Sequence, residues 1–252
     1  MGREGPSESR GGSDTFVVCG PHAVQAFVET RPADVGTVLV EPRSEPPGWL
    51  SPLLQTRIRT VERVELDRLA GGVAHQGIIA VGRPPPSLEI AALWVRRPAL
   101  VLAVDGVTDA RNVGALLRSA EAFGAGAAIL TRDRAPGLSP GLVKAAAGAV
   151  ERLPLARVVN LARVLLDARQ QGYWTLGLDA DGDVDLRDSE RLPDPPRILV
   201  VGAEGRGLRP LIRSRCDRLV RIGMPGRAES LNAAVAGGIA LFALAGPDRP
   251  RP

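Results

Sequence analysis

The feature that most constrains the fold is an alternation of short apolar runs with helix-like segments over the second half of the chain. Each run has four or five residues, apolar except for Thr175 and Arg221, and is flanked on at least one side by Gly or Asp: 100–104, 127–130, 174–178, 198–201 and 219–222. Such runs are typical of strands that a parallel sheet buries on both faces. Helices are expected between and after them, over residues 113–123, 142–149, 159–170, 208–215 and 231–245. The second half therefore predicts a mostly parallel sheet with helices on both faces, whose ligands bind at the carboxyl ends of strands.

The first half predicts a smaller α/β domain over residues 15–84. Strands are expected at 16–19, 37–40, 58–61 and 77–81, and helices at 22–28 and 64–69. The proline run that begins at Pro84 favours extended backbone, so an interdomain linker is expected over 85–97. The second domain then spans 98–246. Residues 1–14, rich in Gly and Ser, are expected to be a disordered leader, and 247–252 a tail.

Composition excludes several classes of protein. With 252 residues and 44% hydrophobic content, the chain has enough apolar material for globular domains. Cys19 and Cys216 lie far apart without a CxxC pair or a histidine at ligand spacing, so neither a metal site nor a disulfide framework is expected. No apolar stretch reaches the ~18 residues of a membrane span, and the polar start is unlike a signal peptide. We therefore expect a cytoplasmic protein with no membrane partner.

Common catalytic templates are also missing from the sequence. Lys144 is the only lysine and does not follow a glycine, which excludes a Walker-type phosphate loop. His22 and His75 both fall in the first half, so the second domain cannot hold a histidine-based triad. There is no HExxH motif either.

Three segments place Gly, Asn or charged residues just after predicted strands. In the first, Gly114 and Arg118 are four residues apart and share a helix face, which suits a phosphate or a sugar. The alternative is a capped helix with a solvated Arg118. In the second, Val201–Leu208, glycines let backbone N–H groups approach a ligand. It lacks the GxGxxG pattern, so a nicotinamide-dependent oxidoreductase is only weakly supported, and Glu204 alternatively holds the loop.

The third segment, Ile222–Asn232, runs from a strand into the last helix. Ser230 is a natural N-cap for that helix, which is its structural interpretation. Asn112 and Asn232 are two of only three asparagines in the chain, and both fall in these loops. Their placement suggests that amide hydrogen bonding is used at a site.

In this order, DGVTDARNVGALLRSAEAFG, VVGAEGRGL and IGMPGRAESLNAAVAGGIAL resemble the three signature motifs of the SpoU-type RNA ribose 2′-O-methyltransferases, the TrmH family of the SPOUT superfamily. CGPHAVQAF and HQGIIAV in the first half resemble the L30e-like substrate-binding domain that precedes the catalytic half in one branch of this family. The resemblance covers roughly residues 15–246.

The resemblance implies S-adenosylmethionine as the methyl donor, no metal, a C-terminal trefoil knot and a homodimer. It implies RNA rather than DNA as partner, with a guanosine of large-subunit (23S) ribosomal RNA as the specific target. Within the class, the alternatives are a transfer RNA ribose methyltransferase and an antibiotic-resistance enzyme that methylates ribosomal RNA. An alternative from another class is a non-catalytic RNA-binding assembly factor.

The resemblance also implies residue roles. Five positions would line the donor site: Gly202, Gly205, Ile222, Met224 and Leu231. Five polar residues match the active-site positions of the family: Asn112, Arg118, Glu204, Ser230 and Asn232. The counterpart of Arg118 is proposed in the family to activate the hydroxyl. A free guanidinium has a pKa above about 12, so a neutral arginine that acts as a base is costly. We therefore favour Arg118 as a clamp on the 3′-phosphate that also polarises the hydroxyl.

The most basic segment is 203–227, with seven arginines against two carboxylates, although the whole chain carries only +4. Arg206, Arg209 and Arg213 are spaced i, i+3 and i+7, which would suit a face that tracks an RNA backbone. The alternative is a solvated helix face in an arginine-rich protein.

Overall fold

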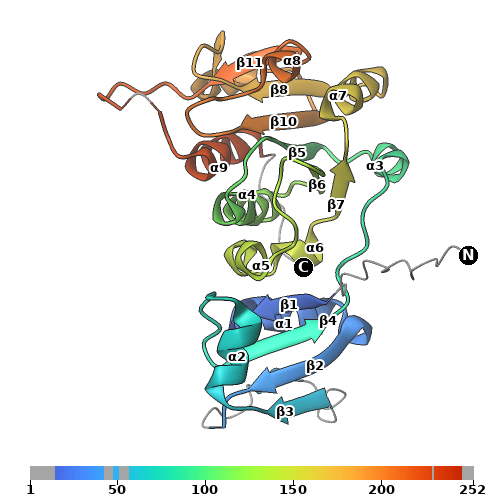
Figure 1. The fold of residues 1–252 in the computed structure, drawn as a ribbon. Coiled ribbons are helices and arrows are strands. Elements are labelled where there is room, and N and C mark those ends of the chain that lie inside the picture. The colour runs from blue at the N-terminus through green and yellow to red at the C-terminus, as the bar shows by residue number, and fades with distance from the viewer. Residues whose placement is uncertain (1–14, 43–47, 51–56, 229, 246–252) are drawn as a thin grey trace, which may run out of the picture.

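The computed structural model describes residues 15–42, 48–50, 57–228 and 230–245, which form two sheets (Figure 1). The first has four strands in the order β1-β4-β2-β3, and only the pair β2–β3 is parallel. The strands are β1 Phe16–Cys19, β2 Val35–Val40, β3 Ile58–Thr60 and β4 Ile78–Gly82. Helix α1 (Pro21–Thr30), followed by the 3-10 turn Pro32–Asp34, packs on one face, and α2 (Arg63–Ala70) packs on the other.

The second sheet has seven strands in the order β7-β6-β5-β10-β8-β11-β9, and every neighbouring pair is parallel. The strands are β5 Leu100–Asp105, β6 Ala127–Thr131, β7 Leu155–Val158, β8 Trp174–Leu178, β9 Val184–Asp185, β10 Arg197–Gly202 and β11 Arg218–Arg221. From β5 the chain adds β6 and then β7 toward one edge of the sheet. The later strands β8 to β11 form the other half. The strand order therefore reverses between β5 and β10, where ligands of such sheets bind.

Side chains alternate between two cores, one on each face of the second sheet. Leu102 and Val104 of β5 face α4 (Ala110–Ala122), α5 (Pro140–Ala146), α6 (Ala149–Arg152) and α9 (Ala233–Leu244). Val101 and Ala103 face α3 (Ile90–Arg96), α7 (Leu161–Gln170) and α8 (Pro210–Arg213). A further 3-10 segment, Leu186–Arg191, follows β9. The predicted α/β class, with a parallel sheet covered on both faces, is confirmed.

Several predicted elements differ from the structure. The predicted linker 85–97 contains α3, because Leu93 is fully buried against the second sheet and that packing outweighs the preceding prolines. The predicted helix 142–149 is broken into α5 and α6 at Ala147 and Gly148, whose φ angles are 49° and 93°. The predicted helix 208–215 shortens to α8, because residues 203–209 form a loop.

The last helix begins later than predicted, at Ala233 instead of residue 231. Its N-cap is Asn232 and not Ser230, because the Asn232 side chain accepts the free N–H groups of the first turn. The leader 1–14 and the tail 247–252 lie outside the described residues, and the knot stays a prediction. None of the described helices is long and apolar enough to cross a membrane. No cluster of metal-binding side chains occurs among the described residues.

The two sheets share one apolar core. Helices α5 and α6 of the second sheet lie beside α1 and β1 of the first (Figure 1), and the same buried cluster includes Phe27, Val143 and Val150. At the border, Arg31 donates from Nε to Oε2 of the buried Glu151 over 2.8 Å. A tightly packed border of this kind fixes the first sheet relative to the second.

Candidate active site

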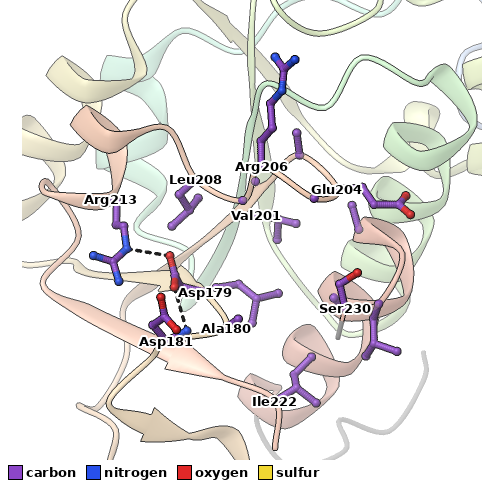
Figure 2. A pocket seen from close by; sticks show the side chains of 18 of the residues that line it. Asp179, Ala180, Asp181, Val201, Glu204, Arg206, Leu208, Arg213, Ile222 and Ser230 are labelled. Carbon is purple, nitrogen blue, oxygen red and sulfur yellow. Dashed lines mark hydrogen bonds and ion pairs between the residues drawn. The ribbon is translucent and has the colours of Figure 1, made fainter. Parts of the chain in front are cut away.

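A cavity of about 440 Å³ opens at the carboxyl ends of β8, β10 and β11 (Figure 2). Its apolar lining includes Leu178, Val201, Leu208, Ile222 and Leu231. Most of its polar side chains come from loops between the strands and helices, and one comes from the end of α8: Asp179, Asp181, Glu204, Arg206 and Ser230 from loops, and Arg213 from α8. A cavity that combines apolar walls with a few polar groups is the usual form of a small-molecule site.

The loop after β10 closes on itself and forms one side of the cavity. Ala203 and Gly207 exchange two backbone hydrogen bonds, of 3.1 and 2.8 Å. A Cβ at Gly202 would lie 2.3 Å from the Gly207 carbonyl, so only glycine allows this close approach. Gly205 and Gly207 have φ angles of 74° and 61°, which side chains disfavour. The glycines of this motif therefore shape a tight loop that carries Glu204 at its turn.

The side chain of Asn232 joins all three motif segments. Its Oδ1 accepts from the backbone N–H groups of Ala234 at 2.9 Å and Val235 at 3.4 Å, which caps α9. Its Nδ2 donates to Oδ1 of Asn112 and to Oε2 of Glu204, both at 3.1 Å. One amide thus connects the start of α4, the glycine loop and the start of α9. Through this hydrogen bond, Glu204 links the glycine loop to the start of α9.

The structure places the predicted site residues in two groups. All five predicted donor-site residues line the cavity: Gly202, Gly205, Ile222, Met224 and Leu231. Of the polar five, Glu204 and Ser230 line it, and Asn112 and Asn232 form the adjoining amide cluster. Arg118 is exposed on α4 and does not line the cavity, and it makes no side-chain hydrogen bond or ion pair with any described residue. The chemical roles of these residues stay predictions.

The predicted arginine stripe is not a row of free side chains. Arg209 donates to the fully buried carboxylate of Asp105 from its backbone N–H at 3.0 Å and from Nε at 2.7 Å. Arg213 pairs with Asp179 at 2.8 Å. Residues 206–209 lie in a loop, so helical spacing does not place them on one face. Only Arg206 of the three has no side-chain partner in the described part of the chain, and its contact with RNA stays a prediction.

Two acidic residues of the cavity, Asp179 and Asp181, were not predicted. Both follow β8, and the Asp181 N–H donates to Oδ1 of Asp179 at 3.0 Å (Figure 2). Burial alone raises the pKa of Asp179, but the hydrogen bond from Arg213, that N–H and the charge of Arg213 together hold it below its ordinary value. The sequence could have indicated them, because Asp179 and Asp181 come directly after a predicted strand, as the three motif loops do.

Gly114 does not form the predicted ligand seat beside Arg118. A Cβ at this position would lie 2.5 Å from the Leu142 carbonyl oxygen and 2.6 Å from Cβ of Ala145. Its missing side chain instead allows α4 to pack closely against α5. The correction follows from the partner helix, which the local sequence does not reveal.

Two parts of the chain match known protein families. Residues 99–242 match the SpoU rRNA Methylase family, and residues 17–88 match the family of RNA 2′-O ribose methyltransferase substrate-binding domains. The chain belongs to the SpoU rRNA methylase family. The predicted family membership is confirmed, and with it the prediction of an RNA methyltransferase.

Relatives of this SpoU methylase cover most of its length. It is 39% identical over 235 residues to the 23S rRNA (guanosine-2′-O-)-methyltransferase RlmB of Pseudomonas putida, with 89% of this chain and 94% of the relative covered. It is 42% identical over 189 residues to an uncharacterized tRNA/rRNA methyltransferase of Mycobacterium avium, with 73% and 60% covered. The structure of the SpoU methyltransferase AviRb from Streptomyces viridochromogenes, in complex with AdoMet, matches with a TM-score of 0.77 and 29% identity, with 96% and 93% covered.

Proposed function

We propose that this SpoU methylase transfers the methyl group of S-adenosylmethionine to the ribose 2′-hydroxyl of a guanosine in 23S ribosomal RNA. The observation that carries the proposal is the Asn232 amide, which ties the three motif segments together beside the cavity. The relatives named RlmB support the choice of RNA and nucleoside. The reaction takes place in the cytoplasm under this proposal, because that is where bacterial ribosomal RNA is found.

The residues of the cavity fit the methyl donor. S-adenosylmethionine supplies an activated methyl group on a cationic sulfur when it is bound. The apolar side chains of Val201, Leu208 and Ile222 suit an adenine ring, and the closed glycine loop exposes backbone groups to its edge. The carboxylates of Asp179 and Asp181 lie in the same cavity. Arg213 pairs with Asp179, so Asp181 is the one of the two that favours a ligand with a positive group.

The amide cluster and Arg118 suit the acceptor ribose. Methyl transfer needs the 2′-hydroxyl held in line with the methyl group and an acceptor for its proton. Asn112 uses its Oδ1 in the cluster and keeps its Nδ2 for a sugar oxygen. The exposed guanidinium of Arg118 is available to a phosphate, which it can bind through paired N–H donors. These residues position and polarise the hydroxyl.

We also propose that the enzyme is a homodimer that associates through α9. Three apolar side chains of this helix are exposed: Val235 by 51%, Ile239 by 40% and Phe242 by 69%. The ring centroids of Phe242 and Phe123 lie 5.6 Å apart. An exposed apolar stripe of this kind is a typical association surface. Sedimentation should show a dimer that Phe242→Glu converts to monomer, whereas Leu211→Glu, on the exposed face of α8, should leave it unchanged. A monomeric wild-type enzyme would refute the proposal.

The methyl transfer itself is tested with labelled S-adenosylmethionine and total RNA from a strain that lacks this protein. A single ribose-methylated guanosine in 23S ribosomal RNA is the expected result. Label only in transfer RNA would identify a transfer RNA enzyme instead. Donor binding without any label would mean that a partner is missing or that the substrate is an assembly intermediate. Absence of donor binding would refute the methyltransferase function and favour the non-catalytic assembly factor.

A further inference from the structure

A second cavity, of about 270 Å³, lies at the carboxyl ends of β6 and β7. It is lined by Thr131, Asp133, Arg134, Val159, Asn160 and Arg209. Arg209 directly follows Leu208, which lines the first cavity, so the two cavities adjoin the same short segment. Its volume equals that of about nine water molecules, which suits a flat ring system rather than a whole cofactor.

The polar side chains of this cavity are available for a ligand. Asp133 and Arg134 are exposed and make no side-chain hydrogen bond or ion pair with any described residue. Asn160 uses Oδ1 to accept the Arg163 N–H at 3.1 Å and cap α7, so its Nδ2 remains free to donate. The cavity thus presents one carboxylate acceptor beside amide and guanidinium donors.

Thr131 gives an independent indication of a ligand. It is the last residue of β6 and only 3% exposed, and its Oγ1 has no hydrogen-bond partner. A buried hydroxyl without a partner is costly, and native proteins rarely retain one without a reason. A bound ligand, or a water ordered by it, would satisfy this group.

The remaining lining residues set the shape of the cavity. Arg209 is held in place by its hydrogen bonds to buried Asp105, so it forms a fixed side of the cavity. Val159 is 71% exposed and offers an apolar surface to the flat face of a ring. The negative charge of Asp105 compensates the positive charge of Arg209, and the negative charge of Asp133 compensates that of Arg134. Such a balanced site does not favour a bare phosphate.

We propose that the second cavity binds a guanine base of the RNA substrate. A carboxylate can accept both N–H groups on the Watson–Crick edge of guanine, and an arginine can donate to its O6 and N7. Asp133 supplies the first group, Arg134 the second, and Nδ2 of Asn160 a further donor. No other common RNA base offers two adjacent N–H donors next to a carbonyl. The inference rests on the proposed function, because it assigns a base-reading site to that enzyme.

The test is a titration of the whole protein with single nucleotides, monitored by NMR of labelled Thr and Val methyl groups. Millimolar guanosine monophosphate should shift the signals of Thr131 and Val159 saturably. Inosine monophosphate, which lacks the 2-amino group, and adenosine monophosphate should bind several-fold more weakly. Asp133→Asn should weaken guanosine monophosphate binding about tenfold, the effect of one lost charged hydrogen bond.

Two further variants make the test specific. Asn160→Asp keeps the α7 cap but replaces the free donor, so it should weaken binding without loss of thermal stability. Arg96→Ala removes an exposed charge on α3 and should leave binding unchanged. Equal shifts by all nucleotides and by inorganic phosphate, no shift with guanosine monophosphate, or wild-type affinity in Asp133→Asn would each overturn the proposal. The titration needs no methyl transfer, so an inactive enzyme would refute the proposed function and not this site.

Discussion

The hydrogen bonds of Asn232 predict a specific loss of stability when its side chain is removed. Asn232→Ala deletes the N-cap of α9, which costs about 1 kcal/mol. It also deletes the bond to Asn112 and the bond to the charged Glu204, which together contribute about 1–2 kcal/mol in this half-exposed place. The expected sum is about 2–3 kcal/mol, or a decrease of roughly 5–10 °C in Tm for a chain of this size.

A second substitution at the same position separates the cap from the bridge. Asn232→Asp retains an N-cap oxygen but puts a carboxylate where Nδ2 lies, 3.1 Å from Oε2 of Glu204. Two like charges at this separation repel by about 1 kcal/mol in water and more where the site is shielded. Asn232→Asp should therefore also lower Tm, even though its cap is intact. The double variant Asn232→Asp with Glu204→Gln exchanges donor and acceptor and should recover most of that loss.

Thermal unfolding measures these stabilities, and single-turnover methyl transfer to 23S ribosomal RNA measures the consequence for the site. We expect Asn232→Ala to lower the transfer rate at least tenfold, since Asn112 and Glu204 lose their common anchor. A transfer rate equal to that of the wild type would refute the role of the amide in the site. A double variant no more stable than Asn232→Asp would show that the contact with Glu204 does not form in solution.

Three further predictions follow from single side chains. Arg118→Ala should abolish methyl transfer while calorimetry still detects donor binding, because Arg118 does not line the cavity; loss of donor binding would contradict this. Gly114→Ala should cost about 1–3 kcal/mol in urea unfolding because its Cβ meets backbone 2.5 Å away, whereas Gly137→Ala, in open space, should be neutral or slightly stabilising. Burial raises the pKa of Cys19 to about 11 and of Cys216 to about 12, against 9.0 ordinarily. At pH 8 the thiolate fraction then falls about a hundredfold and a thousandfold, so a thiol reagent should label native protein at least a hundred times more slowly than unfolded protein; equal rates would show that the thiols are not buried.

Much of the second sheet could be predicted because its strands are short, mostly apolar runs flanked by glycine or aspartate. The runs predicted at 100–104 and 198–201 are β5 and β10, each longer by one or two residues. The elements that were missed carry no local signal. The break between α5 and α6 falls at Ala147, a residue that usually favours helix, and its positive φ follows from how the two short helices pack. Helix α3 was hidden by the prolines before it.

The site was predictable where its chemistry is local and not where it depends on distant partners. The glycine loop and most residues of the first cavity lie at or just after strand ends, and all five positions predicted to bind the donor line this cavity. The pairing of Arg209 with Asp105 joins residues 104 positions apart, and no spacing in the sequence indicates it. The same applies to Arg213, whose partner Asp179 lies on a neighbouring strand end.

The border between the two sheets has a consequence for substrate binding. A Cβ at Gly148 would lie 2.5 Å from Cβ of Ala26, and Arg31 contacts both Glu151 across the border and Asp34 on its own side. Burial raises the pKa of Glu151, and the hydrogen bond and charge of Arg31 from the other side of the border oppose that effect. Close packing and a buried ion pair leave little room for one sheet to turn against the other. The family match assigns RNA binding to the first sheet, and we therefore predict that an RNA bound there meets the cavities of the second sheet at a fixed separation and must adapt its own shape to reach them.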